Sequence, residues 1–79
     1  MFYHVYWSES ELSFQVGQSS FADRPTLTIC SYTERESARV TAHELNTYPW
    51  GSGQLSGLLM RVARQRETER AFHARRYSA

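Results

Sequence analysis

The residue types that most often carry out chemistry are few in this sequence and lie far apart. The three histidines are His4, His43 and His73, and their spacing is not that of a metal site. Glu44 follows His43, but no second histidine lies four residues further on, so the zinc-protease helix pattern is absent. These side chains predict no metal centre.

The remaining candidates for catalysis also have simpler interpretations. Cys30 is the single cysteine and lies in an apolar segment, where a cysteine is more often packed than used as a nucleophile. It cannot form an internal disulfide, so nothing points to an oxidising compartment. Gly51 and Gly53 precede a helical pattern, where free amides can bind phosphate, but no lysine follows and no strand leads in. We therefore expect no enzymatic activity and no cofactor.

Charge is unevenly distributed along the chain, although the net charge is only +1. Residues 1–48 hold three arginines and six acidic side chains, a net charge of −3, whereas residues 49–79 hold six arginines and two glutamates, a net charge of +4. Such a gradient suggests a charged partner or a pairing of the two halves. A small nucleic-acid-binding regulator that uses the arginine-rich C-terminal helix is one alternative, but no known nucleic-acid-binding motif is present.

Length and composition indicate one small folded domain, residues 1–79. The chain is 41% hydrophobic and 14% aromatic, which is typical of a globular protein. It has neither an apolar run of about 18 residues, as a membrane span requires, nor a signal peptide. We expect a soluble protein of the cytoplasm, with no membrane partner.

Three segments have the composition or alternation of strands. Residues 2–7 are aromatic and β-branched, residues 12–16 alternate with period two, and residues 26–32 are rich in threonine and isoleucine. Polar turns at 8–11 and 17–25 separate them. We predict a small antiparallel β-sheet, a three-stranded meander.

A first helix is predicted from about 34 to 45. Residues 33–36 have the form of a capping box, and Ala38 and Ala42 follow helical spacing. Residues 38–42 also alternate as in a strand, which is the alternative for this segment.

A second helix is predicted from about Ser52 to Arg70. Its apolar side chains form one stripe, made of Leu55, Leu58, Leu59, Val62 and Ala63. Arg61 and Arg64 fall opposite that stripe. Because both helices follow the sheet in sequence, they must pack on its apolar face, which predicts an α+β domain with two C-terminal α-helices packed on one face.

The alternation of the strands assigns side chains to the two faces of the sheet. If residues 8–11 connect the first two strands, the buried face carries Tyr3, Val5, Trp7, Leu12, Phe14 and Val16. The outer face then carries Phe2, His4, Tyr6, Ser13 and Gln15, joined by Thr28, Cys30 and Tyr32 if Leu27 and Ile29 enter the core.

A bare face with aromatic residues and few charges is a candidate binding surface. The predicted partner-binding residues are His4, Tyr6 and Tyr32 on this face, Glu9 and Glu11 at the hairpin tip, and Arg61 and Arg64 as a second, independent surface. Self-association through the bare face, as a homodimer or a homo-oligomeric structural protein, is the alternative.

The segment Tyr48-Pro49-Trp50-Gly51-Ser52-Gly53-Gln54-Leu55 leads into an apolar helix that ends in arginines. It resembles the Pro-Gly-Ser-Gly helix start of a small phage-encoded anti-CRISPR protein, a type I-F inhibitor built from an antiparallel sheet and two antiparallel helices. The likeness covers the order of elements over about residues 33–70 and only a few identical residues. Tyr6 is a suggestive aromatic residue in the first strand.

This resemblance implies a non-catalytic inhibitor. Such proteins bind the type I CRISPR surveillance complex (Cascade), often on its backbone subunits, and block target DNA binding in the bacterial cytoplasm during phage infection. Glu9 and Glu11 beside an aromatic face would complement the basic channel of such a complex. Aromatic residues such as Tyr6 would then provide most of the affinity.

Overall fold

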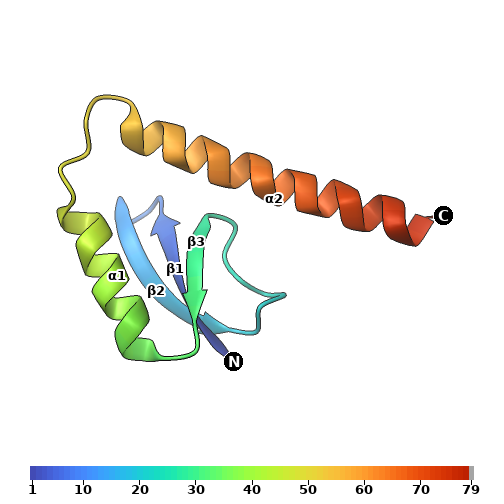
Figure 1. The fold of residues 1–79 in the computed structure, drawn as a ribbon, viewed down its shortest axis with the longest axis horizontal. Helices are drawn as coiled ribbons and strands as arrows, with labels where there is room; N and C mark the ends of the chain where they lie inside the picture. Colours follow the sequence, from blue (N-terminus) through green and yellow to red (C-terminus); the bar gives the residue numbers. More distant parts are fainter. Residues whose placement is uncertain (79) are drawn as a thin grey trace.

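The computed structural model describes the backbone of residues 1–78 and the side chains of residues 1–71. The elements are β1 (Phe2–Ser8), β2 (Ser13–Ser19), β3 (Thr28–Tyr32), α1 (Arg35–Thr47) and α2 (Gln54–Ser78), as Figure 1 shows. The predicted α+β fold is confirmed, because an antiparallel three-stranded sheet is followed by two helices. The side chains of His73, Arg75 and Arg76 lie outside the described residues.

The order of the strands differs from the predicted meander. The sheet order is β2-β1-β3, so the first strand is central and pairs antiparallel with both others. The loop of residues 20–27 carries the chain from β2 to the far edge of β1, and the Trp7 amide donates a hydrogen bond to the Leu27 carbonyl at 3.0 Å. A central aromatic strand thereby gains two hydrogen-bonded neighbours.

The β1–β2 hairpin pairs two residues away from the predicted register. Trp7 lies opposite Phe14 and Val5 opposite Val16, so the connection consists of residues 9–12. Leu12 belongs to this turn, with a left-handed φ of 53° and 73% of its surface exposed, and its prediction as a core residue is wrong. A shift of two residues keeps every other side chain on its predicted face.

Helix α1 closes the core on one face of the sheet. Val5 and Phe14 from the sheet and Ala38 and Ala42 from the helix are buried together, as the predicted helical spacing requires. The capping box does not form: Glu34 precedes the helix without a side-chain cap. The Glu36 carboxylate pairs instead with Arg39 at 2.6 Å, because residues three apart are neighbours on a helix surface.

The end of α1 is fastened to the outer edge of β2. Phe14 donates its amide hydrogen to the Asn46 side-chain oxygen at 2.7 Å, and the Asn46 amide group donates to the Phe14 carbonyl at 2.9 Å. One side chain thus satisfies both backbone groups of an edge-strand residue, which would otherwise be open to pairing. This fixes the position at which the chain leaves α1.

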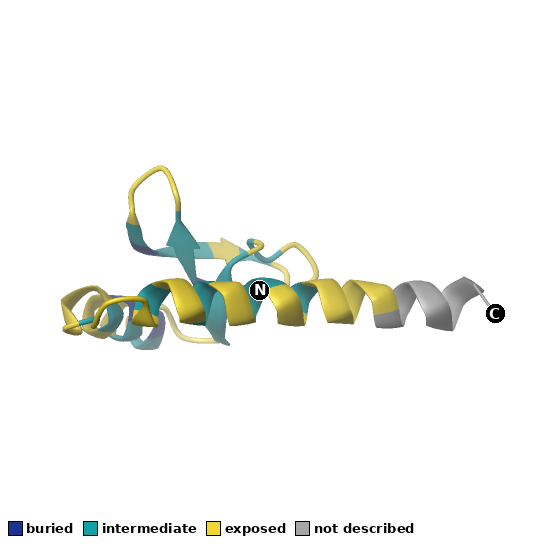
Figure 2. Cartoon of the chain, turned by 90° about the horizontal axis from the view of Figure 1, so that it is seen from above, coloured by how far each residue is buried: buried dark blue, intermediate teal, exposed yellow. Residues whose placement is uncertain are grey.

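Helix α2 touches the core only near its start. Leu55 and Leu58 pack against the buried cluster on the face that α1 covers. Further along, half-buried and exposed residues alternate as the helix passes the 20–27 loop, and residues 67–71 are exposed (Figures 1 and 2). Among the described residues, no helix combines the length and the apolar character needed to cross a membrane.

Candidate functional site

Two of the predicted binding residues meet at the base of the β1–β2 hairpin. Tyr6 and Glu9 line a surface hollow of about 610 Å³ with Pro25 and Leu27 of the following loop. The Tyr6 ring lies over Gly17 on the outer face of the sheet, where an added Cβ would stand 3.2 Å from the ring. The outward placement of Tyr6 is therefore confirmed.

The hairpin tip presents acidic side chains to solvent. Glu9 and Glu11 are exposed, as the sequence predicts. The Ser8 hydroxyl accepts a hydrogen bond from the Glu11 amide at 3.2 Å and lies 3.1 Å from the Ser10 hydroxyl, which holds the turn closed. The two carboxylates thus project from an ordered turn, beside the exposed Leu12.

His4 is not available to a partner, so its prediction as an exposed binding residue is wrong. It is fully buried on the outer face. Its Nε2–H donates to the Ser19 carbonyl at 3.3 Å, and its Nδ1 therefore accepts from the Ser31 hydroxyl at 2.7 Å. Phe2 packs beside the ring at 6.3 Å between centroids, and Phe21 from the 20–27 loop packs on Phe2 at 5.8 Å, so this loop shields part of the predicted bare face.

Tyr32 lies on the opposite face from the predicted one. A β-bulge between Val5 and Tyr6 inserts one residue of β3, so that Val5 pairs with Cys30 while Tyr6 pairs with Thr28. Cys30 and Tyr32 consequently face α1, and the Tyr32 hydroxyl lies 2.8 Å from the Thr41 hydroxyl on that helix. Tyr32 is a packing residue rather than part of an outer surface.

The predicted arginines lie on α2, apart from the sheet face. Arg61 lines a groove between the two helices, and Arg64 is exposed on the helix surface. The predicted binding residues therefore fall into three groups. Tyr6, Glu9 and Glu11 lie at the hairpin, Arg61 and Arg64 lie on α2, and His4 and Tyr32 pack against other elements.

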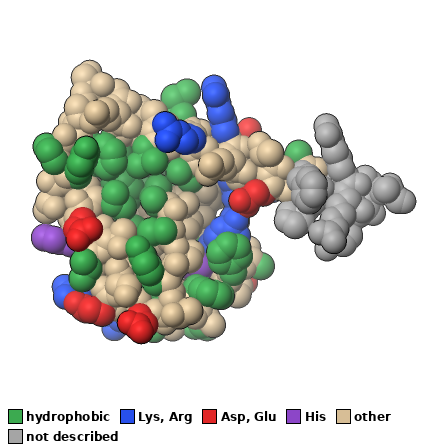
Figure 3. Space-filling model, viewed as in Figure 1, with side chains coloured by type: hydrophobic (Ala, Val, Ile, Leu, Met, Phe, Trp, Pro, Cys, Tyr) green, Lys and Arg blue, Asp and Glu red, His purple; other side chains and the backbone are tan. Residues whose placement is uncertain are grey.

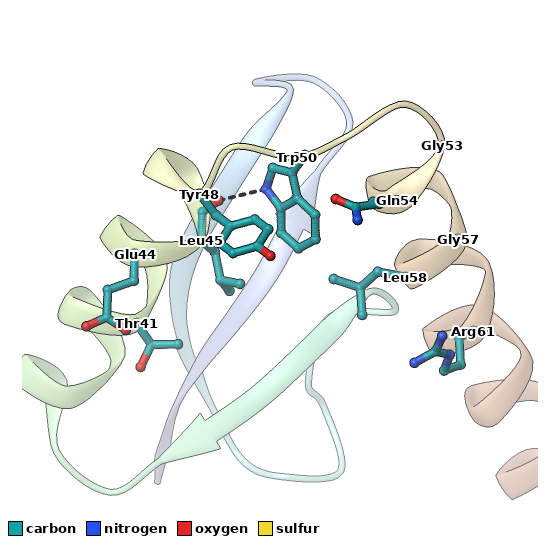
Figure 4. Close-up of a pocket in the computed structure, with 10 residues that line it drawn as sticks. All are labelled: Thr41, Glu44, Leu45, Tyr48, Trp50, Gly53, Gln54, Gly57, Leu58 and Arg61. Atoms are coloured by element: carbon teal, nitrogen blue, oxygen red, sulfur yellow. Dashed lines mark hydrogen bonds between the residues drawn. The ribbon is translucent and has the colours of Figure 1, made fainter.

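A groove next to Arg61 lies between the two helices. It encloses about 630 Å³ between α1 and α2 (Figure 4). Its lining residues are Thr41, Glu44, Leu45 and Tyr48 on the α1 side, Trp50 and Gly53 in the connecting loop, and Gln54, Gly57, Leu58 and Arg61 on the α2 side.

Two aromatic rings give the groove its shape. The Trp50 indole donates a hydrogen bond to the Leu45 carbonyl at 2.9 Å, and the Tyr48 ring packs edge-on against it at 4.7 Å between centroids (Figure 4). Trp50 also lies 6.3 Å from the buried Phe14 ring, so the core fixes its position. Tyr48 remains 54% exposed, so the packed pair of rings presents an aromatic surface to solvent.

Small residues keep the groove open. Gly57 lies inside α2, and a Cβ added there would meet nothing within 4 Å. At the start of the helix, the Gly51 amide donates to the Gln54 side-chain oxygen at 2.7 Å, and Gly53 has a φ of +78° that favours glycine. The glycines therefore turn the chain and leave the space that a side chain would fill.

The hairpin tip and the groove lie at the same end of the molecule. Phe14 connects them, because its ring lies 5.1 Å from Trp7 in the hairpin and 6.3 Å from Trp50 in the groove. We call this region the hairpin–groove end, comprising residues 9–12, Tyr48, Trp50 and the groove lining. Its charged side chains are the acidic Glu9, Glu11 and Glu44 and the basic Arg61.

Sequence reasoning missed the groove, although its signals are present. Tyr48 and Trp50 flank a proline in a loop, which is an unusual place for two large aromatic residues unless they pack on each other. Gly53 and Gly57 are four residues apart, so they lie on one side of the helix start and leave it without side chains. Together these features could have indicated a cleft between the helices.

Metal-ligating side chains are dispersed among the described residues, and the single thiol is partly buried. No group of three histidine, cysteine, aspartate or glutamate side chains lies close enough to hold a metal ion within them. Burial raises the pKa of the Cys30 thiol, and a hydrogen bond with Tyr32 offsets only part of this increase. The raised pKa disfavours the reactive thiolate.

Comparison with known proteins returned no match: no family model, curated protein or solved structure resembles the chain closely enough to identify it.

Proposed function

We propose that this protein is a non-enzymatic inhibitor that binds the type I CRISPR surveillance complex through its hairpin–groove end and blocks target DNA binding. The observation that carries the proposal is the groove between the helices. The segment that resembles the anti-CRISPR proteins, Tyr48–Leu55, supplies four of its lining residues: Tyr48, Trp50, Gly53 and Gln54. The resemblance and the preformed cleft therefore coincide.

The chemistry of this end suits a protein partner. Tyr48 and Trp50 offer aromatic surface at little cost in conformational entropy, because the core and the Leu45 carbonyl already hold the indole. Aromatic side chains in partly desolvated pockets are the residues that most often dominate protein–protein affinity. A partner that inserts apolar side chains into the groove would complete the burial of Leu45 and Leu58.

The charges at the same end favour a basic partner. Glu9 and Glu11 project from the hairpin tip, and Glu44 lines the groove. The hairpin–groove end thus has three acidic side chains and one basic side chain, Arg61. Subunits that hold guide RNA and admit DNA present positive surfaces. Opposite potentials would speed association and orient the inhibitor. By occupying such a surface, the protein would block target DNA sterically, without catalysing a reaction.

The direct test is co-elution of the purified protein with a type I surveillance complex in size-exclusion chromatography, followed by measurement of target DNA binding by the recovered complex. The proposal expects a stable complex that no longer binds target DNA. Failure to co-elute with surveillance complexes of several type I subtypes would contradict it. Co-elution with full DNA binding would also contradict the inhibitory role.

A further inference from the structure

Three arginines converge where the 20–27 loop meets α2, away from the hairpin–groove end. Arg24 of the loop and Arg66 and Arg70 of the helix border a hollow of about 790 Å³ together with Phe21 and Glu69. We call these five residues the arginine hollow. Figure 3 shows arginine and acidic side chains meeting beside apolar ones where α2 leaves the body of the protein.

Arg24 is held firmly at the centre of the hollow. Its guanidinium donates to the Glu69 carboxylate at 2.6 Å and to the Phe21 carbonyl at 3.0 Å, and it stacks 4.1 Å from the centre of the Phe21 ring. Its side chain is only 15% exposed. Glu69 thereby forms its ion pair with Arg24, and the hollow has no second carboxylate for Arg66 and Arg70.

Arg66 and Arg70 leave the hollow positively charged. Arg66 donates to the Arg24 carbonyl at 3.3 Å, and among residues 1–71 neither Arg66 nor Arg70 has a carboxylate within ion-pair distance. The pKa of Arg66 is lowered by its partial burial and by the nearby charges of Arg24 and Arg70, an effect that the Glu69 carboxylate partly offsets. Three guanidinium groups against one carboxylate give the hollow a formal charge of +2, which an anionic ligand would offset.

The geometry points to phosphate as the anion. A guanidinium group offers a planar fork of donors that matches phosphate oxygens, and Arg66 and Arg70 are one helical turn apart, about 6 Å along the axis. Each can therefore bind a separate phosphate group. Beside them the Phe21 ring is 51% exposed, which provides a surface on which a base can stack.

We propose that the arginine hollow binds single-stranded nucleic acid, with successive phosphates at Arg66 and Arg70 and a base against Phe21. This activity goes beyond the proposed inhibition, since it requires neither the groove nor the surveillance complex. It gives Arg66 and Arg70 a role that binding through the hairpin–groove end leaves unexplained.

The test is fluorescence anisotropy of the purified protein with labelled oligothymidylate and oligouridylate, measured across a salt series without any protein partner. We expect the double variant Arg66→Gln/Arg70→Gln to weaken binding about tenfold and to reduce the slope of log K against log salt by about 1.4, or 0.7 for each phosphate that no longer meets an arginine. The matched control Arg35→Gln/Arg39→Gln removes the same charge from α1 and should change the affinity less than twofold. Phe21→Ala should weaken binding about fivefold or more with the slope unchanged.

Any of four results would overturn the proposal. The first is that the wild-type protein fails to bind either oligonucleotide at low salt. The second is that the control double variant loses as much affinity as the hollow variant, and the third is that polyglutamate displaces the labelled oligonucleotide as well as unlabelled DNA does. Because Arg66 also holds the loop, Arg70→Gln alone provides a second variant, with an expected slope change of about 0.7. An unchanged slope in this single variant, with the helical circular dichroism intact, would equally overturn it.

Discussion

At the scale of single residues, His4 shows how a polar side chain becomes part of the interior. Both ring nitrogens have partners, Ser31 on β3 and the Ser19 carbonyl at the end of β2, so the ring links the two outer strands across β1. A buried histidine with both nitrogens satisfied is stable without any charged partner. The alternation of β1 correctly places His4 on the outer face, but alternation cannot show that Phe2 and Phe21 cover it.

His4→Leu should destabilise the fold by about 1–3 kcal/mol, because the Ser31 hydroxyl and the Ser19 carbonyl would lose a partly buried hydrogen-bond partner. Chemical denaturation measures this loss. Tyr6→Phe, which keeps an aromatic ring on the same strand and face, is the control and should change the free energy of unfolding by less than about 1 kcal/mol. Equal stability of the His4 variant and the wild type would contradict the burial of this ring.

Cys30 offers a second test at this scale. Because burial raises the pKa of its thiol, the thiolate fraction at pH 8 is smaller in the folded protein than in the unfolded chain. Alkylation by iodoacetamide should therefore be slower for the folded protein than in guanidinium chloride, and its rate should keep rising at pH values where the unfolded thiol has already ionised. A folded protein that reacts as fast as the unfolded chain would show that Cys30 faces solvent.

At the scale of elements, the helices were predictable and the third strand was only partly so. Regular apolar spacing specifies a helical face directly, and α1 at Arg35–Thr47 includes nearly all of the predicted 34–45 segment. In β3 the alternation reverses at a bulge, so Thr28 faces outward while Cys30 and Tyr32 face α1. A bulge leaves no composition signal in a strand of five residues, and the sequence therefore could not place Tyr32.

The two glycines at the start of α2 should respond in opposite ways to alanine. Gly57→Ala should stabilise the protein by about 0.5–1 kcal/mol, because alanine favours the helix interior and its Cβ meets no neighbour within 4 Å. Gly53→Ala should destabilise it by about 1–2 kcal/mol, because φ of +78° is costly for a residue with a Cβ. Thermal denaturation of the pair tests the loop conformation, and a stabilising Gly53→Ala would contradict it.

At the scale of the whole molecule, the position of α2 separates two surfaces of opposite charge. The radius of gyration is 13.8 Å, above the roughly 12 Å of a compact domain of this length, because α2 runs beyond the sheet. The charge gradient along the sequence becomes a gradient in space, with Glu9 and Glu11 at the hairpin tip and the arginine hollow along α2. The charges along the sequence indicated this asymmetry, but they could not reveal the strand order, in which β1 is central.

The acidic tip should govern the rate of association more than the lifetime of the complex. Glu9→Gln/Glu11→Gln should lower the association rate constant for the surveillance complex and flatten its dependence on salt, because exposed charges act mainly through long-range steering. Surface plasmon resonance at several salt concentrations separates the two rate constants. A change confined to the dissociation rate would indicate instead that these carboxylates are buried in the interface.

The proposed function depends on the groove between α1 and α2 as the surface that receives the partner protein, and the Gly57 position offers its sharpest test. Gly57→Leu fills the groove with a side chain, whereas Gly57→Ala adds one methyl group into open space and preserves the helix. The measurement is the dissociation constant of each variant for the surveillance complex, with circular dichroism as the check of folding. We expect wild-type affinity for Gly57→Ala and an affinity weaker by about tenfold or more, about 1.4 kcal/mol or more, for Gly57→Leu. Two folded variants that bind equally well would contradict the assignment of the groove as the binding surface.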